Sequence, residues 1–165
     1  MNDDLIKRWN ETVPEDGIVF HLGDFSWGNY KDWEKVRNQL NGSITLIKGN
    51  HDETYMTAKM NELFDYVTFQ MKIEVEGRKV YLNHVPFLCY GGTYRDDETK
   101  VWQLFGHVHT NNRSTIVGKD DERLKMLFPT QYDVGVDNND FRPISWAEVK
   151  EKIEKQIELS KFSQK

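Results

Sequence analysis

Residues able to bind a metal ion gather in four short clusters of this 165-residue chain. The clusters are Gly23-Asp24, Gly49-Asn50-His51-Asp52, Asn83-His84 and Gly106-His107-Val108-His109, and they hold four of the five histidines. Imidazole nitrogens and carboxylate oxygens are ligands that suit Mn²⁺, iron and Zn²⁺. A lone histidine is more often structural, but this many polar residues in matching positions favour a metal site.

Two further observations refine the kind of metal site. Side chains on an extended segment alternate between two sides, so His107 and His109 point the same way and could face two adjacent ions. The only cysteine, Cys89, lies outside the clusters. This disfavours a structural zinc site with thiolate ligands and excludes an intrachain disulfide, and a reducing compartment is the simplest expectation.

The elements that must position these clusters alternate between helices and strands. Hydrophobic periodicity predicts helices at 3–13, 32–40, 53–63 and about 145–162, where Ser145 and Glu148 form a capping box. Apolar or alternating runs predict strands at 18–22, 44–47, 71–76, 79–82, 101–105 and 132–136. Each polar cluster follows a strand. The pattern predicts a layered α/β fold with a mixed sheet or two packed sheets, and sites in such folds gather at the carboxyl ends of strands.

Composition restricts the class of protein. Hydrophobic residues make up 38% and aromatic residues 13% of the chain, as in a folded domain, and we expect one domain over residues 1–165. The net charge of −5 disfavours a broad nucleic-acid surface but allows a small phosphate ester held by a metal ion. No apolar run could span a membrane, and the first residues lack the features of a signal peptide, so we expect a cytoplasmic protein.

In their order along the chain, the four clusters resemble the motifs of the calcineurin-like metallophosphoesterases. Members of that family carry Asp-x-His, Gly-Asp, Gly-Asn-His-(Asp/Glu), a lone histidine after a strand, and Gly-His-x-His. This chain shows the last four, within a resemblance that covers about residues 1 to 145 and is closest to small bacterial and phage-type phosphoesterases. The resemblance implies an α/β/β/α sandwich with mixed sheets.

The resemblance also implies a role for each matching residue. Two divalent ions would activate a water molecule for in-line attack on phosphorus. Mn²⁺ is the ion we expect first, with iron, Zn²⁺ and Ni²⁺ as alternatives. His51 would face the phosphate and either protonate the leaving oxygen or stabilise the transition state, and Asp52 would orient its ring. The implied metal ligands are Asp24 as the bridge, Asn50, His84 and His107 for the second ion, and His109 for the first.

The Asp-x-His motif of the family is absent from this chain. The second metal site keeps all its expected ligands, whereas the first keeps only Asp24 and His109. We therefore expect one tightly bound ion, and we expect the first strand of the family to be missing. Three explanations stay open: Met1 is an internal methionine of a longer protein, the gene is naturally shortened, or another chain of a homo-oligomer fills the gap.

The function predicted from these observations is metal-dependent hydrolysis of a small phosphate ester, with diesters favoured over monoesters. One alternative is a catalytically impaired metal-binding remnant or interaction domain of the same fold, and another is a nuclease. His21 is interpreted as structural or as a support for the metal ligands. Trp27, Asn29 and Tyr30 follow Asp24, and they either line the mouth of the site or plug a loop.

Overall fold

Two β-sheets form the frame of the protein. Its structure is a computed structural model, which describes residues 2–90, 100–108 and 126–163. The first sheet is parallel, in the order β1-β2-β3, and the second is mixed, in the order β4-β5-β6-β7. The strands are β1 (Ile18–His21), β2 (Ser43–Ile47), β3 (Tyr66–Thr68), β4 (Gln70–Val75), β5 (Arg78–Asn83), β6 (Val101–Phe105) and β7 (Gln131–Asp133).

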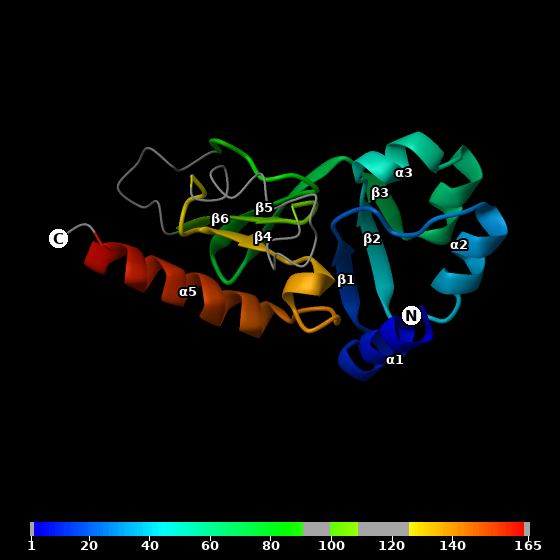
Figure 1. Cartoon of the computed structure of the whole chain (residues 1–165), viewed down its shortest axis with the longest axis horizontal. Helices are drawn as coiled ribbons and strands as arrows, with labels where there is room; N and C mark the ends of the chain where they lie inside the picture. Colours follow the sequence, from blue (N-terminus) through cyan, green and yellow to red (C-terminus); the bar gives the residue numbers. More distant parts are fainter. Residues whose placement is uncertain (1, 91–99, 109–125, 164–165) are drawn as a thin grey trace.

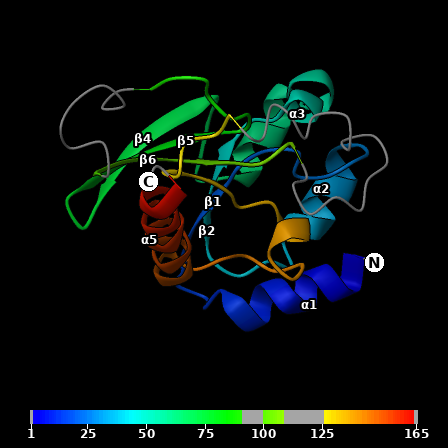
Figure 2. The same cartoon turned by 60° about the vertical axis from the view of Figure 1, so that its left-hand side comes forward.

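Helices flank both sheets. Three α-helices gather around the first sheet, and the long C-terminal helix α5 runs along the second (Figure 1). Turned by 60°, the molecule shows α5 foreshortened, beside the second sheet (Figure 2). The helices are α1 (Asn2–Thr12), α2 (Tyr30–Arg37), α3 (Asn50–Tyr55) and α5 (Trp146–Ser163), with short 3₁₀ helices η1 (Ala58–Leu63) and η3 (Val136–Asn138). The predicted α/β fold of two sheets flanked by helices is confirmed.

One hydrophobic cluster packs the helices onto the first sheet. Ile44 and Leu46 of β2 are fully buried against Trp33 of α2, Trp9 of α1 and Phe64. These residues lie on one face of β2, because alternate side chains of a strand point to the same side. Their burial fixes the orientation of β1 and β2, whose carboxyl ends carry Asp24 and Asn50.

A second cluster packs the other face of the first sheet against the second sheet. Leu22 and Ile47 meet Leu82 and Leu104 there, and α5 contributes Val149 and Ile153, which are almost completely buried. The apolar stripe predicted for the C-terminal helix is therefore core. This cluster holds the ends of β1, β2, β5 and β6 together, and these are the strand ends that the polar clusters follow.

The capping box predicted for the C-terminal helix is present. The Ser145 hydroxyl accepts a hydrogen bond from the Glu148 backbone N–H (3.3 Å), and the Glu148 carboxylate accepts one from the Ser145 backbone N–H (3.0 Å). Arg142 lies 2.5 Å from the same carboxylate. Hydrogen bonds from Arg142 and Ser145 lower the pKa of Glu148 to about 2.

The structure corrects the predicted boundaries of three elements. The helix predicted at 53–63 is two elements, because Met56 has an extended backbone between α3 and η1. The helix predicted at 32–40 runs from Tyr30 to Arg37, since Asn29 caps its start. The strand predicted at 132–136 ends at Asp133, where the carboxylate accepts a hydrogen bond from the Gly135 N–H (2.8 Å) and turns the chain.

Strand β3 was not predicted from the sequence. It spans only Tyr66–Thr68, too few residues for a periodic signal, and its place is set by pairing with β2. Asp65 supports that pairing, since its backbone N–H donates to the Ile44 carbonyl and its carboxylate accepts from the Ile44 N–H. Nothing in three residues of sequence could reveal such a partner.

Candidate metal centre

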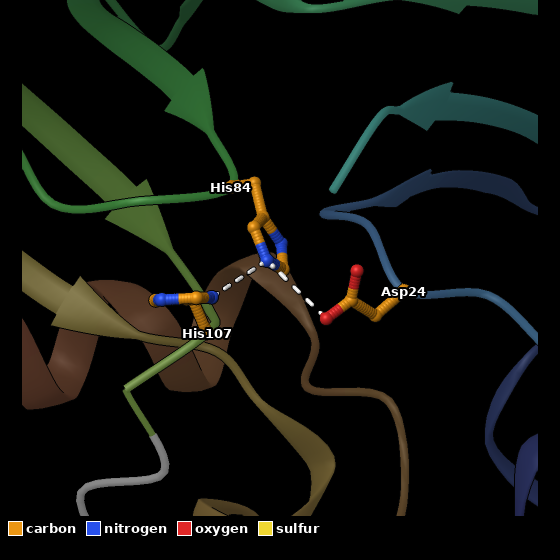
Figure 3. Close-up of side chains that lie close together, drawn as sticks. All are labelled: Asp24, His84 and His107. Carbon is orange, nitrogen blue, oxygen red and sulfur yellow. Dashed lines mark hydrogen bonds and ion pairs between the residues drawn. The ribbon is translucent and has the colours of Figure 1, made fainter. Parts of the chain in front are cut away.

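Four of the predicted ligands converge where the two sheets meet. Asp24 follows β1, Asn50 opens α3 after β2, His84 follows β5, and His107 follows β6. Figure 3 shows Asp24 approaching from the first sheet, with His84 and His107 approaching from the second. The ligand atoms of these three residues all lie within 4.8 Å of one another.

His84 is at the centre of this group. Its Nε2 lies 3.1 Å from Asn50 Oδ1, 3.1 Å from His107 Nδ1 and 3.4 Å from Asp24 Oδ2 (Figure 3). Metal–ligand bonds of about 2.0–2.2 Å place neighbouring ligand atoms roughly 3 Å apart. The spacing around His84 Nε2 therefore fits a shared ion.

The hydrogen bonds of the His84 ring support the same conclusion. Its Nδ1 lies 2.6 Å from the Leu22 carbonyl oxygen, which can only accept, so Nδ1 carries the proton. In the neutral ring Nε2 then has a free lone pair, and it faces the carboxylate of Asp24 and the amide oxygen of Asn50. Three acceptor atoms that face one another repel unless a cation lies between them. This donor set fits a divalent metal ion.

Two of the predicted ligands have strained backbones. Asp24 has φ of 55° and His107 has φ of 69°, a left-handed region that residues with a side chain rarely occupy. Such strain persists only where the surrounding structure enforces it, and it is concentrated at functional sites. The surrounding structure thus holds both residues in a backbone conformation that they would not prefer by themselves.

Gly23 and Gly49 allow the loops after β1 and β2 to approach each other closely. Gly23 has φ of +95°, and a Cβ atom there would lie 2.5 Å from both the Gly49 nitrogen and His84 Nδ1. A side chain at this position would push apart the loops that carry the ligands. Gly23 is therefore needed for conformation as well as for space, and Gly49 is needed for space alone, because a Cβ atom there would run into Asp24.

Asp52 is fully buried, and its carboxylate holds the two loops of the first sheet together. It accepts hydrogen bonds from the backbone N–H groups of Asp24 (2.7 Å), Phe25 (3.0 Å) and Gly49 (2.9 Å). Among the described contacts no hydrogen bond joins Asp52 to the His51 ring, and the expectation that Asp52 orients this ring stays a prediction. Sequence reasoning missed this bracing of the Asp24 loop, because backbone donors leave no mark in the residue pattern.

His51 lies beside the ligands but outside their group. Its backbone N–H donates to Asp24 Oδ1 (3.0 Å), and its ring Nε2 lies 4.0 Å from Asp24 Oδ2. Its side chain is 42% exposed. The ring can therefore meet a molecule that approaches the ligands from solvent.

The structure also shows the positions of the other residues that the sequence analysis singled out. The His21 ring stacks on Trp9 and meets Phe25 edge-on, and burial lowers its pKa below the usual 6.5. Asn29 caps α2, and Tyr30 donates a hydrogen bond to Glu34 from the first turn of that helix. Trp27 is 65% exposed, with its ring centroid 4.4 Å from that of His51, so it plugs no loop. His109 lies outside the described residues.

The geometry defines a protein of the two-sheet α/β class with a candidate metal centre between its sheets. Comparison of the sequence with known protein families identifies the family. Residues 2–128 match the calcineurin-like phosphoesterase superfamily domain. The chain belongs to this superfamily, which accords with phosphoester hydrolysis as its general chemistry and with the use of divalent metal ions.

Two individual proteins are similar to the chain. An uncharacterised protein of Methanocaldococcus jannaschii, MJ1445, is 32% identical over 157 residues, which is 94% of this chain and 76% of that protein. The crystal structure of AQ665, a protein of unknown function from Aquifex aeolicus, superposes with a TM-score of 0.64 at 22% identity. It matches 91% of this chain and 83% of the other, a likeness that shows the fold. No helix among the described residues is long and apolar enough to cross a membrane.

Proposed function

We infer that this protein hydrolyses small phosphate esters, diesters in preference to monoesters, with Mn²⁺ or a similar divalent ion at the centre between its sheets. The observation that carries the proposal is the convergence of Asp24, Asn50, His84 and His107 on one point, with His51 exposed beside it. The diester preference rests on likeness to the family, since one fold hosts several phosphoester reactions.

The ligands would hold the ion with two oxygen and two nitrogen atoms. When bound, a divalent ion neutralises charge on the phosphoryl oxygens and makes a water molecule acidic enough to attack phosphorus. Asp24 supplies the negative charge of this set, and the Leu22 carbonyl keeps His84 in the tautomer that can bind. We expect one ion to stay bound after extensive dialysis, and two tightly held ions per chain would contradict this.

His51 would act on the leaving group. Its ring is solvent-accessible, and the carboxylate of Asp24 lies near its Nε2. A protonated His51 can donate its proton to the ester oxygen that departs from phosphorus, which prevents the release of a strongly basic alkoxide.

The test is hydrolysis of two diesters with added Mn²⁺, comparing the wild type with His51→Ala. Bis(p-nitrophenyl) phosphate, whose leaving group needs little protonation, shows whether diesters are cleaved at all, and 2′,3′-cyclic AMP, whose leaving oxygen is a basic alkoxide, tests the general acid. Loss of that acid should lower kcat for the cyclic nucleotide by about 10²- to 10⁴-fold while the metal content stays unchanged. Glu53→Ala alters an exposed residue two positions further along α3, and this control should keep full activity.

Three results would contradict the proposal. Equal activity of the wild type and His51→Ala toward the cyclic nucleotide would show that the assigned acid takes no part in the reaction. Bound metal without turnover of diester or of p-nitrophenyl phosphate would favour the non-catalytic metal-binding domain. Cleavage of single-stranded oligonucleotides in preference to the small diester would favour the nuclease.

A further inference from the structure

Two large aromatic side chains are exposed beside His51. Trp27 is 65% exposed and Tyr55 is 53% exposed, and their ring centroids lie 5.8 Å apart. The Trp27 ring is also 4.4 Å from the His51 ring, at an angle of 55°. A single exposed aromatic residue on a soluble protein needs no explanation, but an adjacent pair next to a candidate active site does.

The chain on both sides of Trp27 is fixed. Before it, the Phe25 N–H donates to the buried Asp52, and the Phe25 ring packs against Trp33 and Phe64. After it, the Asn29 side chain accepts a hydrogen bond from the Lys31 N–H at the start of α2. The intervening segment is therefore short and anchored at both ends.

Gly28 restricts this segment further. It has φ of +104°, and a Cβ atom there would lie 2.5 Å from Asp32 Oδ2. The same Asp32 carboxylate accepts a hydrogen bond from the Asn29 N–H (2.8 Å). The loop is thus closely fitted to the first turn of α2, and it holds the Trp27 indole outward in a defined place. A preorganised ring loses little entropy when a ligand stacks on it.

We propose that Trp27, assisted by Tyr55, is a stacking surface for a flat aromatic group of the phosphoester, such as a nucleobase or an aryl ring. The inference rests on the proposed function, because it places the phosphate at the metal centre and the aromatic group over Trp27. Stacking between a base and an aromatic side chain contributes about 1–3 kcal/mol. The net charge of −5 favours a small nucleotide or aryl ester over a nucleic-acid polymer.

A competing explanation is that Trp27 only packs against His51 and keeps its ring in place. The two roles differ in what they change. A packing role alters turnover of every substrate by a similar factor and leaves the affinities of ligands with and without an aromatic group in the same ratio. A stacking role changes that ratio.

The experiment measures the ratio directly in the Mn²⁺-loaded protein by equilibrium titration. One arm compares AMP with ribose 5-phosphate, and the other compares phenylphosphonate with methylphosphonate. Each pair differs by one flat group, so the two arms separate a nucleobase from a simple aryl ring. The wild type should bind the aromatic member of at least one pair about 10-fold more tightly, within the range of about 5- to 150-fold that stacking allows.

Substitutions identify the ring responsible. Trp27→Ala should bring the ratio close to one, Trp27→Phe should keep most of it, and Tyr55→Ala should lower it by a smaller factor. Tyr66→Ala removes an equally exposed ring (55%) from the first sheet, opposite Thr45 of β2, and should leave the ratio unchanged. Circular dichroism and thermal unfolding of each variant establish that it is folded.

Three results would overturn the inference: equal affinity within both pairs in the wild type, no binding of either aromatic ligand at millimolar concentration, or an unchanged ratio in Trp27→Ala. The proposed function fails separately. If the ratio depends on Trp27 but no ester is hydrolysed, the stacking surface stands without the enzyme. If diesters are hydrolysed and the ratio is one, the enzyme stands without the stacking surface.

Discussion

The two sheets contribute to the candidate metal centre in different ways. The first sheet would supply oxygen ligands, Asp24 and Asn50, from loops that Asp52 braces by three backbone hydrogen bonds. The second sheet would supply imidazoles, His84 and His107. The His84 ring is oriented by the Leu22 carbonyl, which belongs to the first sheet's side of the site. The half of the site on the first sheet is thus held by hydrogen bonds within that half. In the half on the second sheet, the His84 ring is oriented by a carbonyl group from across the interface.

Because of this contrast, we expect substitutions in the two halves to have different effects on stability and on metal affinity. Damage to the first half should loosen the loops and cost stability, because a buried network loses its acceptor. Damage to the second half should cost metal affinity and leave the fold in place. The predictions below test that separation, from the largest expected effect to the smallest.

The largest effect is expected for Asp52→Ala. It removes the acceptor of three backbone N–H groups, and leaving buried donors unpaired should lower the free energy of unfolding by about 3–5 kcal/mol. Denaturant titration measures this, with Glu53→Ala as the control at an exposed neighbouring position. A loss no larger than in the control would mean that the first half does not depend on its buried carboxylate.

His84→Ala should leave the fold but remove tight metal binding. Loss of a group that only supports a ligand costs about 10- to 100-fold in affinity, so loss of the central ligand should exceed 100-fold. Isothermal titration with Mn²⁺ measures the affinity, and His51→Ala is the matched control because its ring lies outside the ligand group. Equal Mn²⁺ affinity in the two variants would move the metal centre away from His84.

Gly23→Ala tests the contact between the halves, and Gly77→Ala is its matched control. Both glycines have positive φ, +95° and +73°, but a Cβ atom at Gly77 meets nothing within 4 Å, whereas one at Gly23 meets Gly49 and His84. The control should cost about 1 kcal/mol from backbone strain alone. Gly23→Ala should cost about 2 kcal/mol more from crowding and should also weaken Mn²⁺ binding. Equal losses would show that the loops have room to move apart.

The smallest effect concerns Glu148, which belongs to neither half of the site. Its pKa is lowered to about 2 in the folded protein from the ordinary 4.5. Its contribution to stability is therefore present above pH 4.5 and is lost as the pH falls toward 2. Because the group is about one-third exposed, we expect only about 1 kcal/mol. Glu148→Gln should flatten the fall in unfolding free energy over this pH range, and metal binding at neutral pH should not change.

The sequence predicted which polar residues lie close together better than it predicted the element boundaries. Asp24, Asn50, His84 and His107 could be grouped because each follows a strand, and parallel strands bring their carboxyl ends to one edge. The capping box at Ser145 was equally predictable, since both of its partners lie within one turn. These signals are local and depend on residue type.

The parts that could not be predicted depend on the backbone of distant segments. The Leu22 carbonyl that orients His84 lies 62 residues away from it, and any residue type could supply that oxygen. The bonds of Asp52 to the loop after β1 are invisible for the same reason. Strand β3 exists only through its pairing with β2. Such contacts become visible only when the fold is known.

The hydrogen bond between Leu22 and His84 has a consequence for the choice of metal ion. Since the imidazole is oriented across the interface, the distance between the predicted ligands of the two halves depends on how far apart the two sheets lie. Apolar side chains such as Ile47, Leu82 and Leu104 pack between the sheets, and none of them is a predicted ligand. The relative affinities of ions that differ in preferred bond length would thus depend on the packing of the hydrophobic core. A methyl group gained or lost there would change which ion binds best, although it lies away from the site.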